Sequence, residues 1–278
     1  MIYNRPEYWL AKTETVGPYL TFSSPNSFTL AVGDATKHWD GTLEYSTDTS
    51  AWSTWDGTTT LSSAISGSDN VLYLRGTGNT VIGYYDEADT EEYIPWAING
   101  TDVRCDGNIE TLLDYATVEA GQHPVMAEYC FGGLFMGCTA LITPPELPAT
   151  TLADYCYECI FQDCTSLTQP PALPATTLAV SCYAEMFKSC DSLTQPPALP
   201  ATTLAEDCYS HMFYNCDGLK LSSTQTGEYT QEYRIPASGT GTTATNALTD
   251  MFAITGGTFD GTPEINTTYY LSNTNTIV

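Results

Sequence analysis

The sequence predicts a mixed β and α+β fold, in which an antiparallel β-sandwich is followed by a solenoid of 26-residue repeats. Three observations predict it. Residues 18–105 alternate between apolar and polar residues in short runs. From residue 130 onward, cysteines recur at a spacing of 26 residues. All five tryptophans precede residue 97, whereas all ten cysteines lie at or beyond Cys105, which places a domain boundary near residues 100–105.

The predicted β-sandwich occupies residues 18–105. The runs PYLTFSS, SFTLAVG, GTLEYSTD, AWSTWDG and NVLYLRG are rich in β-branched and aromatic residues, and turn-forming Gly, Asn, Asp, Ser or Pro residues separate them. Such short, regularly spaced strands are typical of an antiparallel sandwich. The run LEYSTDTSAWSTWDG predicts a hairpin that brings Tyr45, Trp52 and Trp55 together. These aromatics form either a sugar-binding platform or, as we favour, core and cross-strand pairs.

The chain is strongly acidic, with a formal charge of −25 from 8 Lys plus Arg and 33 Asp plus Glu. Such a surface repels phosphate backbones and anionic lipids, so we expect no nucleic-acid partner and no membrane insertion. The charge favours solubility over recruitment of calcium or of a basic partner. The acidic run from Asp86 to Glu92 lacks the spacing and the glycine of an EF-hand loop, which favours a solvated loop.

Two cysteines eight residues apart mark each of four repeats: CFGGLFMGC, CYECIFQDC, CYAEMFKSC and CYSHMFYNC. Each block predicts a short helix, with both cysteines and the Leu, Ile or Met between them on one face. Between the blocks stands SLTQPPALPATTLA, at residues 166–179 and again at 192–205. Its leucines predict a brief strand, and its prolines, which donate no amide hydrogen, predict an extended segment after it. The structural cysteine ladder comprises Cys130, Cys156, Cys182, Cys208, Cys138, Cys164, Cys190 and Cys216.

A short strand, a turn and a short helix in each period are typical of a leucine-rich-repeat solenoid. The pattern Met-Phe-x-x-Cys-x-x-Leu, followed by Leu-Pro and an apolar helix start, resembles the BspA-type leucine-rich repeats of bacterial surface proteins. It is most similar to the Cys-rich versions of gut bacteria and their phages. The resemblance covers residues 126–222, and it implies an Ig-like β domain before the repeats. The proline pair departs from the commoner strand pattern of that family.

The predicted organisation has three parts. Residues 1–17 are expected to form an N-terminal attachment segment, and residues 18–105 the β-sandwich domain. The solenoid, residues 106–278, begins with an N-terminal cap at 106–129, followed by four Cys repeats at 130–222. Residues 223–278 hold an insertion and a degenerate C-terminal cap, in which Ala247 and Thr255 replace the two cysteines. A solenoid needs such an atypical repeat to close its apolar end.

Disulfides, zinc ligands and plain core residues are the alternatives for the cysteines. Partners eight apart on one helix would be about 12 Å apart, and a disulfide needs Cα atoms within about 7 Å. Bonds between adjacent repeats stay geometrically open, but we favour buried free thiols. With three histidines in the chain, and with Cys159 having no counterpart in the other repeats, we expect no metal.

The sequence shows no catalytic motif. His38, His123 and His211 stand in unrelated contexts, and there is no P-loop, dinucleotide fingerprint or His-x-x-x-His. We therefore expect neither an enzyme nor a cofactor.

The four repeats can be compared with one another. The Pro-rich tile is nearly constant, whereas outward positions of the cysteine blocks vary and are either neutral surface or a binding face. We expect the aromatic column that begins at Phe131 to be partly exposed beside them. The candidate recognition surface comprises Phe131, Tyr157, Tyr183, Tyr209, Glu158, Glu185, His211, Gln162, Lys188 and Tyr214.

These features predict non-enzymatic recognition or adhesion at a surface. The first residues lack the basic and apolar regions of a secretory signal. We therefore expect a phage virion component on the virion surface: a fibre, capsid decoration or receptor-binding protein. Its partners would be other virion proteins, through the N-terminal segment or β domain, and a host-surface glycan or protein; it could form a homo-oligomer. The alternatives are a bacterial cell-surface adhesin without its signal and a purely structural decoration protein.

Overall fold

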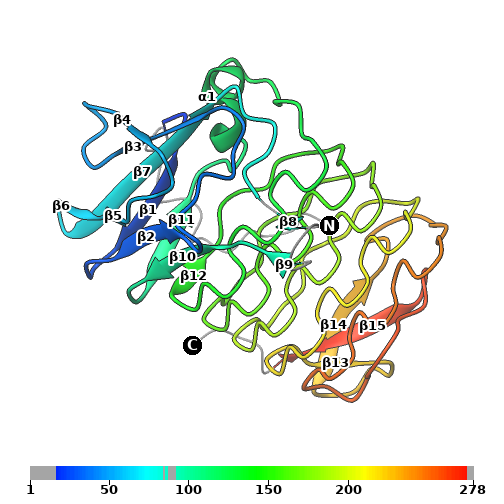
Figure 1. Ribbon diagram of the computed structural model, residues 1–278. Helices are drawn as coiled ribbons and strands as arrows, with labels where there is room; N and C mark the ends of the chain where they lie inside the picture. Colours follow the sequence, from blue (N-terminus) through cyan, green and yellow to red (C-terminus); the bar gives the residue numbers. More distant parts are fainter. Residues whose placement is uncertain (1–16, 84, 87–91, 274–278) are drawn as a thin grey trace.

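The computed structural model describes residues 17–83, 85–86 and 92–273 (Figure 1). Strands account for 26% of the described residues and helix for 4%, so the repeats do not each contain a helix. The described residues form several small sheets and one helix. The expected attachment segment at residues 1–17 lies outside the described residues except for Gly17.

The N-terminal part contains two sheets of mostly antiparallel strands. In the larger sheet the order is β12-β11-β1-β7-β3-β4, with β6 also paired to β7; the smaller sheet has the order β10-β2-β5. Four of these strands, β1 to β4, fall within alternating sequence runs, and β7 extends one residue beyond the fifth run at each end. The bounds are β1 Leu20–Ser24, β2 Thr29–Val32, β3 Thr42–Ser46, β4 Ser53–Trp55, β5 Leu61–Ser62, β6 Ala64–Ser66, β7 Asp69–Thr77, β10 Trp96–Asn99, β11 Val103–Asp106 and β12 Leu141–Thr143.

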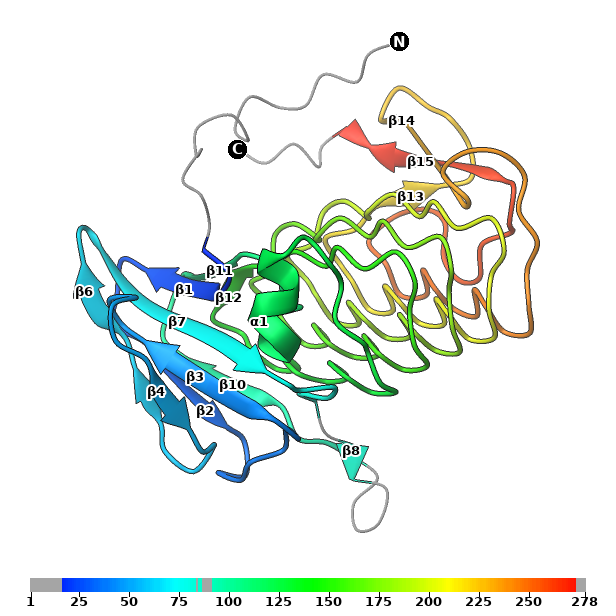
Figure 2. The ribbon, with the colours of Figure 1, turned by 90° about the horizontal axis from the view of Figure 1, so that it is seen from above.

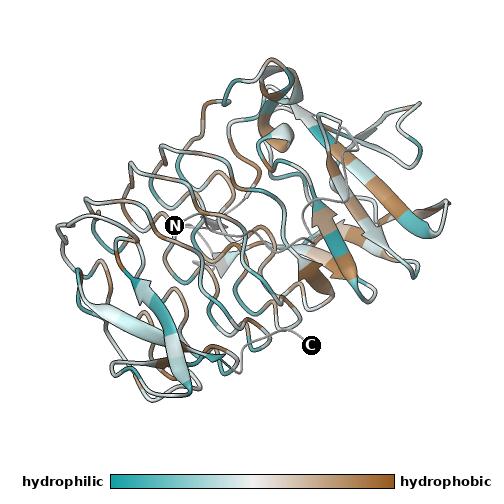
Figure 3. Cartoon of the chain, turned by 180° about the vertical axis from the view of Figure 1, so that it is seen from behind, coloured by the Kyte–Doolittle hydropathy of each residue, from teal (hydrophilic) through white to brown (hydrophobic). Residues whose placement is uncertain are grey.

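Alternation along these strands separates core from surface, as the brown and teal segments of Figure 3 show. On β7, Leu72 and Leu74 are fully buried. Arg75, the next residue, is half-buried and forms an ion pair with Glu44 of β3 at 2.8 Å. Trp55 is 1% exposed and packs against other core tryptophans, whereas Trp52 lies outside the core with Arg75 above its ring. The two tryptophans therefore do not form a shared sugar-binding platform.

The helix α1 (Thr111–Glu119) packs on β7. Gly76 makes this close approach possible, because a Cβ atom there would lie 1.6 Å from the Leu112 carbonyl oxygen. Leu112 and Leu113 are fully buried on the inner side of the helix. A short hairpin, β8 (Tyr85–Asp86) and β9 (Glu92–Tyr93), leaves the N-terminal sheets before β10. Most of the acidic run from Asp86 to Glu92 lies outside the described residues.

The predicted leucine-rich-repeat solenoid is wrong, because the cysteine blocks contain no helix and the repeats form no continuous sheet within the described residues. Each block is instead a series of four-residue turns. Every fourth residue has a positive φ, as at Tyr129, Gly133 and Gly137 with angles of 57°, 61° and 74°. A left-handed residue at each fourth position prevents the amide-to-carbonyl bonding between residues i and i−4 that defines an α-helix.

The backbone amides of a block alternate between two kinds of partner. The amide of Leu134 donates to Phe131 within the same turn, at 3.2 Å. The amide of Phe135 donates to Ile160, in the next block, at 3.0 Å. The first block makes five bonds of the second kind, from Tyr129, Phe131, Gly133, Phe135 and Gly137 to Asp154, Cys156, Glu158, Ile160 and Gln162.

The same five bonds recur from each of the next three blocks, so the blocks stack as parallel layers (Figure 2). We call them turn layers 1 to 5: residues 129–138, 155–164, 181–190, 207–216 and 246–255. The prolines of the intervening tile leave little strand structure: the first repeat has β12, which pairs in parallel with β11, and the last has β13 (Leu221–Ser222). One apolar core runs from the N-terminal sheets through all five layers.

A three-stranded sheet lies at the opposite end of the stack from the N-terminal sheets (Figure 1). Its order is β13-β15-β14, with β14 at Tyr229–Arg234 and β15 at Thr268–Ser272. β14 belongs to the segment inserted between layers 4 and 5. Its Tyr233 and the ring of Phe252 in layer 5 pack edge to face, so this sheet covers part of the apolar end.

Candidate recognition face

The aromatic column expected to be partly exposed is buried. Phe131, Tyr157, Tyr183 and Tyr209 are at most 1% exposed, and their rings stack at 5.7 to 5.9 Å between centroids. The prediction of exposure is wrong because a four-residue turn gives residues four apart the same orientation. The aromatic residue after the first cysteine therefore faces inward together with the Phe four positions later. These four residues are core and are not available to a partner.

Two of the buried tyrosines keep a hydroxyl without a hydrogen-bond partner. The Oη atoms of Tyr157 and Tyr183 are inaccessible, and no described residue bonds them. The equivalent residue in layer 1 is Phe131, which fills the same space without a polar group. An unpaired buried hydroxyl costs about 1–3 kcal/mol, so these two positions are suboptimal for stability.

The cysteine ladder lies in the interior, where all ten cysteines of the chain are free and buried. The second thiol of a layer donates to the Phe carbonyl of the preceding layer: Cys164 to Phe135 at 3.1 Å and Cys190 to Phe161 at 3.1 Å. Burial raises the pKa of Cys138 and Cys216 to about 12, which keeps both as unreactive thiols at neutral pH. The ladder is therefore a packing element.

The remaining candidate residues lie on the outer side of the layers. We call Gln162, Glu185, Lys188, His211 and Tyr214 the recognition face; all five are partly exposed. Glu185 and His211 are at the left-handed positions of layers 3 and 4, with φ of 54° and 53°. These two residues stand at equivalent positions of consecutive layers, and both side chains are partly exposed.

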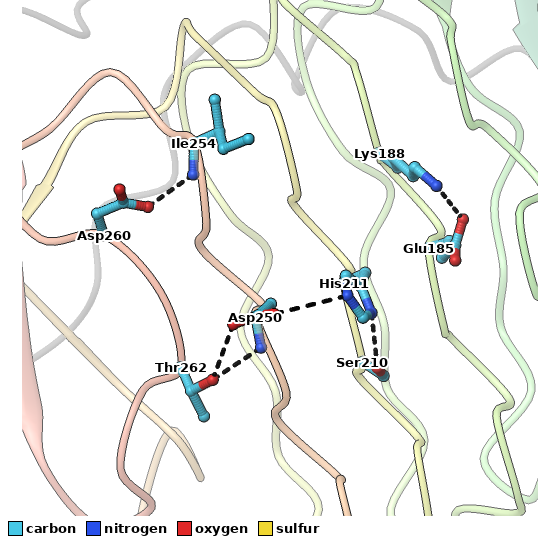
Figure 4. Close-up of polar contacts among 8 residues, drawn as sticks. All are labelled: Glu185, Lys188, Ser210, His211, Asp250, Ile254, Asp260 and Thr262. Carbon is cyan, nitrogen blue, oxygen red and sulfur yellow. Dashed lines mark hydrogen bonds and ion pairs between the residues drawn. The ribbon is translucent and has the colours of Figure 1, made fainter.

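Lys188 of the recognition face has a polar partner within its own layer and an aromatic neighbour in the next; Figure 4 shows the first of these contacts. The Nζ of Lys188 donates to Oε2 of Glu185 at 2.7 Å and lies 5.9 Å from the Tyr214 ring centroid. Burial acts to lower the pKa of Lys188, but the hydrogen bond and charge of Glu185 outweigh it and raise that pKa. The Lys188 ammonium therefore stays charged between an acid and an aromatic ring.

Glu158 does not belong to the open part of the surface, because β9 covers it. Tyr93 donates its hydroxyl hydrogen to Oε2 of Glu158. The same tyrosine lies against Gly132 and Gly133 of layer 1, where an added Cβ atom would come within 2.7 Å and 2.4 Å of its ring atoms. Sequence reasoning missed this contact, although the Gly-Gly pair, at a site where other layers carry side chains, was a signal for it.

The environment of Glu158 raises the pKa of its carboxyl to about 7. Burial is the largest cause, and the charges of Glu185 and Asp207 act in the same direction, while the hydrogen bond from Tyr93 opposes them. The contact between the N-terminal hairpin and layer 2 therefore contains an acid that titrates near neutral pH.

Ser210, His211 and Asp250 follow the order of a catalytic triad without its geometry. The Oγ of Ser210 is 2.8 Å from Nδ1 of His211, but Nε2 of His211 is 3.8 Å from Asp250, beyond hydrogen-bond reach (Figure 4). The nearest amides, of Ser210 and His211, donate to Asp207 and Thr249, so they offer no oxyanion hole. The arrangement does not support acyl transfer.

The other two histidines lie beside acidic side chains. His38 contacts Asp34 at 2.8 Å, and His123 contacts Glu110 at 2.7 Å. Within the described ranges no group of three or more His, Cys, Asp or Glu side chains could hold a metal ion. The helix of the described chain is neither long nor apolar enough to cross a membrane.

Comparisons with protein-family models, with curated proteins and with solved structures find no match for this chain. No family assignment therefore stands behind the BspA-type resemblance of the cysteine motif.

Proposed function

We propose that this chain is a non-enzymatic recognition protein that binds a protein partner through the recognition face of layers 2 to 4. The observation that carries the proposal is the contrast between the two sides of each layer. The inward Phe column from Phe135 to Phe252 keeps one residue type, whereas the outward column at Gln162, Lys188 and Tyr214 changes in every layer. A rigid support with variable outward side chains suits recognition.

The chemistry of the face favours a protein over a sugar. Tyr214 has Lys188 on one side and the His211 ring at 5.5 Å, a cluster of the aromatic and cationic types that dominate binding energy at protein interfaces. Two cavities of about 400 and 310 Å³ occur in the described chain, and no residue of the recognition face lines either one. Neither cavity could therefore hold a ligand at this face.

The net charge of −25 indicates what kind of protein surface fits. A partner with a basic patch would associate faster at low ionic strength, because complementary charge raises the association rate. Glu185 and Asp250 supply acidic groups within or beside the face, with side chains 32% and 50% exposed.

The test compares a face variant with a matched surface variant on arrays of folded proteins and of glycans. The double substitution Lys188→Glu with Tyr214→Ala should abolish protein binding, while Lys37→Glu, an exposed lysine in the N-terminal part, should leave it unchanged. Binding to glycans alone, or protein binding that the face variant retains, would refute the proposal. Display on a virion surface or on a bacterial cell surface stays a prediction.

A further inference from the structure

The backbone amide-to-carbonyl hydrogen bonds between turn layers all run from one layer to the next along the chain, so the last layer, layer 5, has backbone donors on its outer side. In layer 4, the amides of Asp207, Tyr209, His211, Phe213 and Asn215 donate to layer 5. The equivalent donors of layer 5 lie 39 positions later, at Asn246, Leu248, Asp250, Phe252 and Ile254. Residues 256–273 form no sixth layer, so these five amides need other acceptors.

Residues 260–262 satisfy three of the five donors. The amide of Ile254 donates to Oδ1 of Asp260 at 2.6 Å, and the amide of Phe252 to the carbonyl of Gly261 at 3.0 Å. The amide of Asp250 donates to Oγ1 of Thr262 at 2.8 Å (Figure 4). The next residues, 263–265, lie beside layer 5 but accept no hydrogen bond from its amides.

The other two donors, the amides of Asn246 and Leu248, have no hydrogen-bond partner among the described residues. A cavity of about 400 Å³ lies beside them, between residues 243–249 and residues 262–265. In the preceding layers, a segment of the next layer fills the equivalent space: the carbonyls of Thr245 and Ala247 accept from Asp207 and Tyr209 at 3.1 and 2.9 Å.

The geometry points to a docking site for a short extended peptide of a partner protein, whose backbone carbonyls accept from the amides of Asn246 and Leu248. Two donors two residues apart match carbonyls two residues apart on a peptide, as they do between every pair of layers. Such an addition at an open backbone edge gains main-chain hydrogen bonds, and its side chains give specificity.

The lining of the cavity specifies the side chains of that peptide. Glu264 is the charged residue of the lining and is exposed, so a Lys or Arg of the peptide would find an acid beside the edge. The net charge of −25 disfavours an acidic peptide in the same place. The apolar part of the lining, which suits small apolar side chains next to the cationic one, comprises Ala244, Ala247, Leu248, Pro263 and Ile265.

Hydrogen exchange resolved at single amides tests the site in the full-length protein. The probe is a set of acetylated, amidated pentapeptides that carry one Lys or Arg among Ala, Ser, Thr and Val. In the free protein the amides of Asn246 and Leu248 should exchange fast, and those of Asp207 and Tyr209 slowly. A bound peptide should slow exchange at Asn246 and Leu248 by about tenfold when its concentration is ten times its Kd.

Three variants complete the test. Ala244→Trp, which fills the cavity, should abolish the slowing, and Glu264→Lys should weaken binding of cationic peptides about tenfold. Ser223→Trp, an exposed residue outside the lining, should have no effect. Slow exchange at Tyr209 verifies that each variant is folded. The inference is wrong if Asn246 and Leu248 are already protected in the free protein, if no millimolar peptide slows them, or if Ala244→Trp retains the slowing.

Discussion

The Tyr93 hydroxyl donates to the Glu158 carboxylate across 65 positions of sequence, and this bond connects the β8–β9 hairpin to the second turn layer. The ring of Tyr93 rests on Gly132 and Gly133 of layer 1, so the hairpin contacts two consecutive layers. The first repeat therefore differs from the others because the N-terminal part packs on it.

The raised pKa of Glu158 makes this contact dependent on pH. An acid whose pKa is raised from 4.5 to about 7 by folding binds more protons in the folded than in the unfolded chain between these values. Stability from this group is therefore present below pH 4.5 and is lost as pH rises through about 7, by up to about 3 kcal/mol. Glu158→Gln should remove this dependence and raise stability above pH 7.

Urea denaturation at pH 5 and pH 8 measures the effect. Glu119→Gln, an exposed acid at the end of α1, is the control and should follow the wild type at both values. If wild type and Glu158→Gln lose the same stability between the two pH values, the buried acid is not the cause.

Substitutions at two glycines of layer 1 distinguish the cost of backbone strain from the cost of contact with Tyr93. Gly133 and Gly137 both have left-handed φ, at 61° and 74°, but an added Cβ meets Tyr93 at Gly133 and nothing within 4 Å at Gly137. Gly137→Ala should cost about 1 kcal/mol of unfolding free energy. Gly133→Ala should cost about 1–3 kcal/mol more, because the tyrosine has to move. Equal losses in urea denaturation would mean that the hairpin does not rest on layer 1.

Removing an unpaired hydroxyl should stabilise the protein. Tyr157→Phe and Tyr183→Phe each delete a buried Oη that has no partner, and each should raise the free energy of unfolding by about 1 kcal/mol. Tyr233→Phe is the matched control: its Oη donates to the Pro197 carbonyl at 3.4 Å, and its removal should not stabilise. Thermal and urea denaturation of the three variants give the comparison. A loss of stability in Tyr157→Phe would show that its hydroxyl is bonded in solution.

Thiol titration tests the cysteine ladder. The native protein should react slowly or not at all with a thiol reagent, because burial raises the pKa of Cys208 and Cys216 to about 12. After unfolding without reductant, all ten thiols should react. A smaller number would reveal disulfides between adjacent layers, the alternative that sequence spacing leaves open.

The sequence identified the repeat and much of its surface without help from the structure. The 26-residue spacing places the first four layers, and the constancy of Phe135 and its equivalents marks the interior. Gln162, Lys188 and Tyr214 were expected to face outward, and they are partly exposed. These inferences succeed because stacking gives equivalent positions of the layers the same environment. The residue types at those positions therefore indicate which ones are buried.

The tertiary structure decided how the blocks bond and what each repeat contacts. Apolar residues four apart fit both a helix of 3.6 residues per turn and a series of four-residue turns, so the pattern in Cys130, Leu134 and Cys138 does not distinguish them. The hydrogen-bond partner of each backbone amide distinguishes the two structures. Half of the amides in a layer donate to carbonyls of the next layer, and these bonds exist only when the layers are stacked. For the same reason, the burial of Tyr157 and the contact of Tyr93 with Gly133 depend on segments that are distant in sequence and adjacent only after folding.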